Sequence, residues 1–377
     1  MSENVQQADG MDVICERRGR MGLITLNRPR ALNALSLAMV RTLTATLLAW
    51  ERDPLVDAVA LRGMGKEGPF GAFCAGGDIR FFHQAALAGN PELEDFFTEE
   101  YALNHLVHRY AKPYVVFMDG IVMGGGMGIA GHGGVRSLRI ATERTKMAMP
   151  ETNIGLFPDV GGGWFLGRCP GALGDYLALT GQVIGGEDAL AATLADGVLP
   201  AGELAATWEA LASGGLPAVE ALRGALAGAG QARQGGDTAG GLAARREVID
   251  RCFAAPSVPA IVQALEAEPG DWARETIAAL RKRSPLMLHV VREQLHRARS
   301  LSLADALRME RDMVRRCFHL RPGAASETVE GIRALAVDKD HAPRWNPPRI
   351  EDVTPAMWAP FFQSPWPPHA HPLRDLH

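Results

Sequence analysis

Two glycine-rich segments have the composition of loops whose backbone amides can bind an anionic oxygen. They are Phe73–Asp78, with the sequence FCAGGD, and Met123–Gly128, with the sequence MGGGMG, and each leads into a segment with helical character. Glycine lets the backbone approach a ligand closely, and the first N–H groups of a helix point outward with partial positive charge. Two such amides that converge on one point would stabilise the negative oxygen that develops during acyl transfer. Taken alone, each segment is better explained as a tight turn.

Two carboxylates further along the chain have the chemistry of an acid, a base or a nucleophile. Glu151 follows Pro150, and Asp159 lies eight residues later, between Pro158 and the glycines at 161–163. Without further context, Glu151 charges the first turn of a helix and Asp159 belongs to an ordinary turn. Because a helix start favours the charged form, we expect Glu151 to be ionised. Asp159 is expected in a flexible turn that suits it to positioning a polar group.

The segments around these residues alternate between strand and helix patterns, which indicates an α/β fold. The patterns predict strands at 21–26, 56–62 and 113–118, and helices at 32–53, 92–110 and 171–180. Asp78 is expected to cap the helix that follows the first glycine segment.

The composition is that of a globular protein with one large domain or two. The chain has 377 residues, 47% of them hydrophobic, with a net charge of −4, and its mean hydropathy is −0.03. Such a charge excludes a surface that generally coats nucleic acid. The five cysteines form no CxxC motif, Met1–Gly10 does not resemble a signal peptide, and no apolar run reaches membrane-spanning length. We therefore expect a cytoplasmic protein.

Composition also divides the chain into three parts. Residues 201–246 are rich in Ala and Gly, and we expect helices joined by a mobile linker near 228–241, or alternatively a disordered insert. The last residues contain nine prolines and should run over the surface in extended form. We expect a core at 12–200, a helical C-terminal region at 201–342 and a Pro-rich tail at 343–377.

The combination of motifs resembles the enoyl-CoA hydratase/isomerase (crotonase) superfamily. Leu26–Pro29, followed by Asn33–Leu35, is similar to the N-terminal signature of that superfamily, and the two glycine segments are similar to its oxyanion loops. The resemblance covers 12–200 and implies a crotonase-like (ClpP/crotonase) spiral of β-β-α repeats with a helical C-terminal region. It also implies that the amides of Gly77 and Gly125 hold the thioester oxygen of an acyl-CoA.

Departures from the hydratase pattern point to one family within the superfamily. Hydratases use two glutamates, and at the matching positions this chain has Gly128 and Glu151. A carboxylate pair that adds water to a double bond cannot be assembled there. Asp159 stands where hydratases typically have glycine. Four separated blocks resemble the 3-hydroxyisobutyryl-CoA hydrolases and extend the resemblance almost to the C-terminus: 118–126, 132–133, 149–163 and 330–340.

This second resemblance implies hydrolysis of the thioester of 3-hydroxyisobutyryl-CoA, or of a similar short β-hydroxyacyl-CoA, as in valine breakdown. Glu100 matches a substrate-binding position near the thioester, and Glu151 and Asp159 match two acidic positions at the reacting carbon. Glu151 could attack the carbonyl or activate water, and Asp159 could orient the 3-hydroxyl or assist the leaving thiolate. An enoyl-CoA hydratase or isomerase is the alternative function, and a non-catalytic member of the fold is a third.

The expected partners are few. The resemblance implies no cofactor, because CoA is part of the substrate. His105 and His108 lie three apart on a predicted helix, but no further metal ligand is evident at a suitable spacing, so we expect no metal. We expect neither nucleic acid nor a membrane as partner, and the sequence leaves a homo-oligomer open.

Two basic clusters have two explanations each. They are Arg281–Lys282–Arg283 and the helical face formed by Arg308, Arg311 and Arg315. Either cluster could contact the phosphates of CoA, but a solvated helix face explains each of them at least as well.

Overall fold

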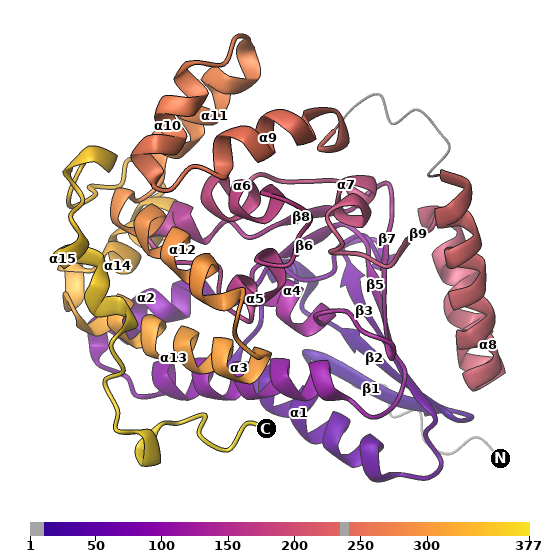
Figure 1. Ribbon diagram of the computed structural model, residues 1–377. Coiled ribbons are helices and arrows are strands. Elements are labelled where there is room, and N and C mark those ends of the chain that lie inside the picture. The colour runs from indigo at the N-terminus through magenta and orange to yellow at the C-terminus, as the bar shows by residue number, and fades with distance from the viewer. Residues whose placement is uncertain (1–10, 234–240) are drawn as a thin grey trace. The chain divides into compact units, whose positions relative to one another are not determined.

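The computed structural model describes residues 11–233 and 241–377 (Figure 1). By their contacts these residues fall into two compact units. Among the described residues, unit 1 comprises 11–77, Leu106–Met147 and 184–233. Unit 2 comprises Asp78–His105, Ala148–Val183 and 241–377. The division expected from composition, at residues 200 and 342, stays a prediction.

Unit 1 contains a sheet whose strands are mostly parallel. Its strands, in the described residues, are β1 (Val13–Arg18), β2 (Met21–Leu26), β3 (Ala58–Gly65), β4 (Gly68–Pro69), β5 (Tyr114–Met118), β7 (Ser137–Ala141) and β9 (Gly197–Val198). The order is β1-β2-β3-β5-β7-β9, with β4 paired to β3. The pairing is antiparallel between β1 and β2 and parallel from β2 to β9. All residues of β2 and β5 are buried, as expected for parallel strands covered on both faces.

Helices of unit 1 cover this sheet. They are η1 (Pro29–Ala31), α1 (Leu37–Arg52), α4 (Gly125–Ala130), α7 (Gly186–Ala191), η3 (Ala201–Glu203) and α8 (Leu204–Arg233). Trp208 of α8 packs in the core with ring centroids 6.3 Å from Phe70 and 5.8 Å from Phe117. A smaller sheet pairs β6 (Ile121–Met123) with β8 (Lys146–Ala148).

Unit 2 is built almost entirely of helices. They are α2 (Ile79–Ala88), α3 (Glu92–Arg109, of which the last turn belongs to unit 1), η2 (Glu151–Ile154), α5 (Gly162–Leu166), α6 (Leu173–Thr180), η4 (Ala243–Arg245), α9 (Arg246–Phe253), α10 (Val258–Glu266), α11 (Asp271–Lys282), α12 (Pro285–Ala298), α13 (Leu303–His319), η5 (Gly323–Ala325), α14 (Glu327–Ile332), η6 (Arg333–Val337), η7 (Ile350–Asp352), α15 (Pro355–Trp358), η8 (Ala359–Phe362) and η9 (Pro368–Ala370). As predicted, Asp78 caps α2, and its carboxylate accepts a hydrogen bond from the Phe81 N–H at 3.4 Å.

The predicted elements agree with the structure where the signal is local. The strand at 21–26 and the helix at 92–110 are confirmed as β2 and α3. The helix expected from residue 32 begins only at Leu37. Ser36 caps it, and Leu35 instead donates its N–H to Gly76 O at 2.8 Å.

The C-terminal tail is less extended than expected. Residues 343–377 contain α15 and the 3-10 helices η7, η8 and η9. Proline occupies the first turn of α15, η8 and η9, where its missing N–H costs no hydrogen bond and its fixed φ suits a helix start. The prolines of the tail therefore lie at the starts of short helices as well as in extended segments.

Two expectations concern residues that the structure does not describe. The expected linker near 228–241 includes residues 234–240, and the signal-peptide expectation concerns Met1–Gly10; both stretches lie outside the described residues. Within the part of the chain that is described, no helix is both long and apolar enough to cross a membrane.

Candidate active site

The two glycine segments lie against each other within unit 1. The N–H of Met123 donates to Cys74 O at 2.9 Å. A Cβ atom at Gly76, whose φ is +97°, would lie 3.0 Å from Met123 O, and a Cβ at Gly126 would lie 2.5 Å from Cys74 O. The close approach of the two segments therefore requires glycine at both positions.

The backbone amides of Gly77 and Gly125 both lie next to the start of a helix. Gly77 directly precedes the capping residue of α2, and Gly125 is the first residue of α4. Among the described residues, neither N–H has a hydrogen-bond acceptor. Gly125 N lies 3.4 Å from the position that a Cβ on Gly76 would take. The structure thus brings together the segments that carry the two predicted oxyanion amides.

Asn33, which belongs to the N-terminal signature, holds the first glycine segment in place through hydrogen bonds of its side chain. Its side chain is fully buried, and its amide nitrogen lies 3.0 Å from both Ala72 O and Phe73 O. Its carbonyl oxygen accepts the N–H of Arg28 at 2.8 Å. The conformation of the loop at 72–77 is therefore fixed by a residue about forty positions earlier.

A cluster of buried carboxyl groups lies in unit 2. It consists of Glu100 on α3, Glu151 at the start of η2, Asp159 before α5, and Glu310 on α13; we call it the acidic cluster. These side chains are between 0 and 6% exposed. Among the described residues none of them has an ion-pair partner. The structure therefore brings together Glu100, Glu151 and Asp159 and adds a fourth carboxyl group, while their assigned roles stay predictions.

The surroundings of Glu151 oppose the ionised form that we expected from its place at a helix start. Burial first, and then the neighbouring Asp159 and Glu310, raise the pKa of Glu151 well above its usual value. Its own backbone N–H opposes this, but η2 has only four residues and supplies a weak dipole. Desolvation outweighs the helix start. The Oε2 atom of Glu151 is buried with no hydrogen-bond partner among the described residues, as is Oε1 of Glu100.

Asp159 sits in a fixed turn, which corrects the expectation of a flexible one. The hydroxyl of Tyr101 donates to Asp159 Oδ2 at 2.9 Å. The next residue, Val160, has a φ of +53°, a strained conformation for a β-branched side chain that only a well-determined loop can hold. Burial raises the pKa of Asp159 to about 6, against the hydrogen bonds from Tyr101 and from its own backbone N–H.

Glu310 and Gln294 hold this turn, and the sequence analysis missed both. Glu310 accepts the N–H of Gly161 at 2.7 Å and that of Gly163 at 3.1 Å. The Gln294 amide donates to Glu310 Oε1 at 3.1 Å and to Pro158 O at 2.7 Å. Burial and, less strongly, Asp159 raise the pKa of Glu310 to about 8, while the N–H donors act in the opposite direction.

A sequence signal for Glu310 did exist. It lies on the apolar stripe of α13 at the spacing of Leu303, Leu307, Val314 and Cys317, and a carboxylate at such a position is buried. A charged residue on a buried stripe, with no basic residue three or four positions away on the helix, indicates a polar partner elsewhere in the fold.

The acidic cluster can hold and transfer protons. Each of Glu100, Glu151 and Glu310 has its pKa raised in part by Asp159. Carboxyl groups that interact in this way cannot all be ionised near neutral pH, so they share protons and titrate as a group. Such a group can offer one charged oxygen as a base or nucleophile beside a protonated neighbour.

The three arginines of the helical face, Arg308, Arg311 and Arg315, form ion pairs with carboxylates of the protein itself. Arg311 is buried and ion-pairs with Glu94, which Arg315 also contacts at 2.9 Å. Arg308 contacts Asp305 at 2.7 Å. Internal pairing therefore accounts for this basic cluster. No group of three or more His, Cys, Asp or Glu side chains in the described ranges is arranged to hold a metal ion.

Comparisons with known proteins identify the family. A family model described as enoyl-CoA hydratase/isomerase matches residues 21–362. The mitochondrial 3-hydroxyisobutyryl-CoA hydrolase of Rattus norvegicus is 39% identical over 365 residues, covering 97% of this chain and 91% of that protein. The resemblance to these hydrolases is thereby confirmed.

Solved structures agree with this assignment. A carnitinyl-CoA dehydratase from Mycobacterium thermoresistibile is 39% identical with a TM-score of 0.78, covering 93% of this chain and 96% of that chain. An enoyl-CoA hydratase from Rhodobacter sphaeroides 2.4.1 is 36% identical with a TM-score of 0.79, covering 94% and 98%. The crotonase-like α/β fold predicted from the sequence is confirmed. The chain belongs to the enoyl-CoA hydratase/isomerase family.

Proposed function

We propose that this protein hydrolyses the thioester of 3-hydroxyisobutyryl-CoA, or of a similar short β-hydroxyacyl-CoA, to the free acid and CoA. One observation supports this most strongly: Asp159 and Glu151 belong to one buried cluster, in which the charge of Asp159 helps to raise the pKa of Glu151. The position at which a hydratase has its other glutamate is Gly128, inside the buried helix α4. The relatives named 3-hydroxyisobutyryl-CoA hydrolase support the choice of substrate.

In the proposed mechanism the amides of Gly77 and Gly125 donate hydrogen bonds to the thioester oxygen. They would stabilise the negative charge that this oxygen gains when the carbonyl carbon is attacked. Either Glu151 takes a proton from a water that attacks the carbon, and the thiolate of CoA leaves, or Glu151 attacks the carbon itself. In the second route the thiolate leaves as a transient anhydride forms between the acyl group and Glu151, and water then hydrolyses the anhydride to the free acid. Asp159 hydrogen-bonds the 3-hydroxyl, and Glu100 binds the substrate near the thioester.

The proposal extends to cofactors, partners and location. The substrate brings its own CoA, and we propose no separate cofactor or metal. We propose that the partners are acyl-CoA substrate and, where the chain self-associates, copies of itself. We also propose a cytoplasmic location, a reducing compartment that suits the five cysteines, none of which is joined by a disulfide in the described structure. The name of the rat relative places that protein in mitochondria.

Hydrolysis is expected to dominate over hydration. The purified protein should release thiol from 3-hydroxyisobutyryl-CoA much faster than it hydrates crotonyl-CoA, because a carboxylate pair for hydration is missing at Gly128. Free thiol can be followed with a chromogenic disulfide while the absorbance of crotonyl-CoA is recorded in parallel. Rapid hydration without thiol release from the hydroxyacyl substrate would favour the hydratase alternative and refute this proposal.

Replacing Gly125 with Val is expected to lower kcat by about 10²–10³-fold, the usual cost of losing one oxyanion donor. The branched side chain would crowd the buried start of α4 and displace the N–H. Gly202→Val is a matched control, since a Cβ at Gly202 meets nothing within 4 Å. Near-normal turnover by a folded Gly125→Val variant would show that the thioester oxygen binds elsewhere.

A further inference from the structure

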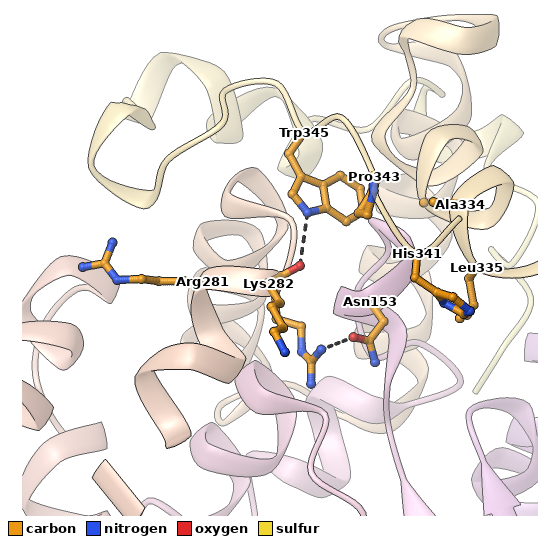
Figure 2. A pocket seen from close by; sticks show the side chains of 10 residues that line it. Asn153, Arg281, Lys282, Ala334, Leu335, His341, Pro343 and Trp345 are labelled. Carbon is orange, nitrogen blue, oxygen red and sulfur yellow. Dashed lines mark hydrogen bonds between the residues drawn. The ribbon is translucent and has the colours of Figure 1, made fainter. Parts of the chain in front are cut away.

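A cavity of about 520 Å³ in unit 2 is lined by segments that are distant in the sequence (Figure 2). Asn153 comes from η2, Lys282 and Arg283 from the junction between α11 and α12, and Trp345 from the C-terminal tail. This volume is within the range of sites that bind small molecules, roughly 300–1,000 Å³. The cavity contains the basic cluster at 281–283 that the proposed reaction does not use.

The charge of this cavity is positive and largely uncompensated. Its lining residues, all in the described part of the chain, include three cationic side chains and no Asp or Glu. Of the three, Arg281 lies near carboxylates of the described chain, Glu266 at 3.5 Å and Glu351 at 3.3 Å. Among the described residues, Lys282 has no ion-pair partner. A cation beside a cavity without a counter-charge favours an anionic ligand.

Arg283 adds a second uncompensated charge at this cavity. Its Nε donates to Thr180 O at 2.8 Å, and its Nη1 donates to Asn153 Oδ1. Both acceptors are neutral, so these hydrogen bonds orient the guanidinium without cancelling its charge. Figure 2 shows the hydrogen bond to Asn153 within the cavity lining. Arginine and lysine together are the usual donors to phosphate oxygens in proteins.

One part of the lining is apolar and aromatic. Leu335, Pro343 and the indole of Trp345 contribute to it. The indole Nε1 donates to Lys282 O at 3.2 Å, which fixes the ring beside the lysine (Figure 2). A ring held in this way offers an aromatic surface on which a planar base can stack.

We propose that this cavity binds a phosphate ester attached to a planar ring, the chemistry of an adenine nucleotide. Lys282 and Arg283 would contact the phosphate, and Trp345 would stack on the base. Two sources carry this chemistry: a free nucleotide, and the nucleotide end of CoA. Only the second source rests on the proposed function.

Isothermal titration of the full chain with AMP tests the proposal. AMP is expected to bind with 1:1 stoichiometry, and Lys282→Gln should weaken its binding about tenfold, as for the loss of one charge-assisted contact. Arg274→Gln is the matched control, because it removes an exposed charge of the same helix, α11, outside the cavity lining. Trp345→Ala should weaken AMP about tenfold while the weaker binding of inorganic phosphate stays the same.

The outcomes of the titration distinguish a free nucleotide from the nucleotide end of CoA as the ligand. They also include the results that would overturn the proposal. Saturating CoA will abolish AMP binding if the site takes the nucleotide end of CoA, and will leave it intact if the site takes a free nucleotide. Absence of AMP binding at millimolar concentration, or equal weakening by Lys282→Gln and Arg274→Gln, would overturn the proposal. Because titration needs no turnover, failure of the proposed hydrolysis would leave this result unaffected.

Discussion

Replacing Glu151 with Gln is expected to reduce thiol release from 3-hydroxyisobutyryl-CoA by about 10³–10⁴-fold, in the upper part of what one positioned base contributes. The buried Oε2 of Glu151 has no partner among the described residues, so it is available to the substrate or to a water. Gln keeps the size of the side chain but provides neither a base nor a nucleophile. The measurement is kcat for both proteins under single-turnover and steady-state conditions.

A matched variant separates this chemical loss from a loss of folding. Glu275→Gln makes the same change on the exposed side of α11, outside the acidic cluster, and should keep wild-type activity. Removing a buried, partly uncompensated carboxyl group should also leave Glu151→Gln at least as resistant to thermal unfolding as the wild type. Turnover within tenfold of the wild type would exclude Glu151 as base or nucleophile.

The sequence predicted those parts of the site that depend on neighbours along the chain. The apolar run at 21–26 and the helical spacing at 92–110 are local patterns that the structure confirms. The family motifs assign Gly77, Gly125, Glu151 and Asp159 to the site, and that assignment stays a prediction. The direction in which the pKa of Glu151 moves could not be predicted, because the helix start is visible in the sequence and burial is not. Desolvation by distant residues raises its pKa more than the local N–H lowers it.

The support of Asp159 could not be predicted either. Glu310 lies about 150 residues from Gly161, and Gln294 lies about 136 residues from Pro158. Neither pair has a spacing that a periodic pattern would reveal, since tertiary packing alone brings α12 and α13 to the turn. The apolar stripe of α13 shows that Glu310 is buried, but not which amides it accepts.

Replacing Asp159 with Asn is expected to remove most of the preference for substrates that carry a 3-hydroxyl. Sites built to bond a hydroxyl can discriminate by 10⁴–10⁵-fold, and we expect a loss of about 10³-fold because Asn keeps one acceptor. Tyr101 can still donate to that oxygen, so the turn should keep its conformation. The measurement is kcat/KM for 3-hydroxyisobutyryl-CoA and for isobutyryl-CoA, which lacks the hydroxyl, in both proteins.

The same variant should also change the pH dependence of turnover, in a direction that the charges determine. Asp159 raises the pKa of Glu151, so removing its charge should lower that pKa. If Glu151 acts in its ionised form, activity is lost as pH falls through this pKa, and the acidic limb of the profile for isobutyryl-CoA should therefore move to lower pH in Asp159→Asn. An equal slowing of both substrates with an unmoved acidic limb would contradict both effects. Asp159 would then serve the chemical step itself, for example by protonating the leaving thiolate, rather than the recognition of the hydroxyl.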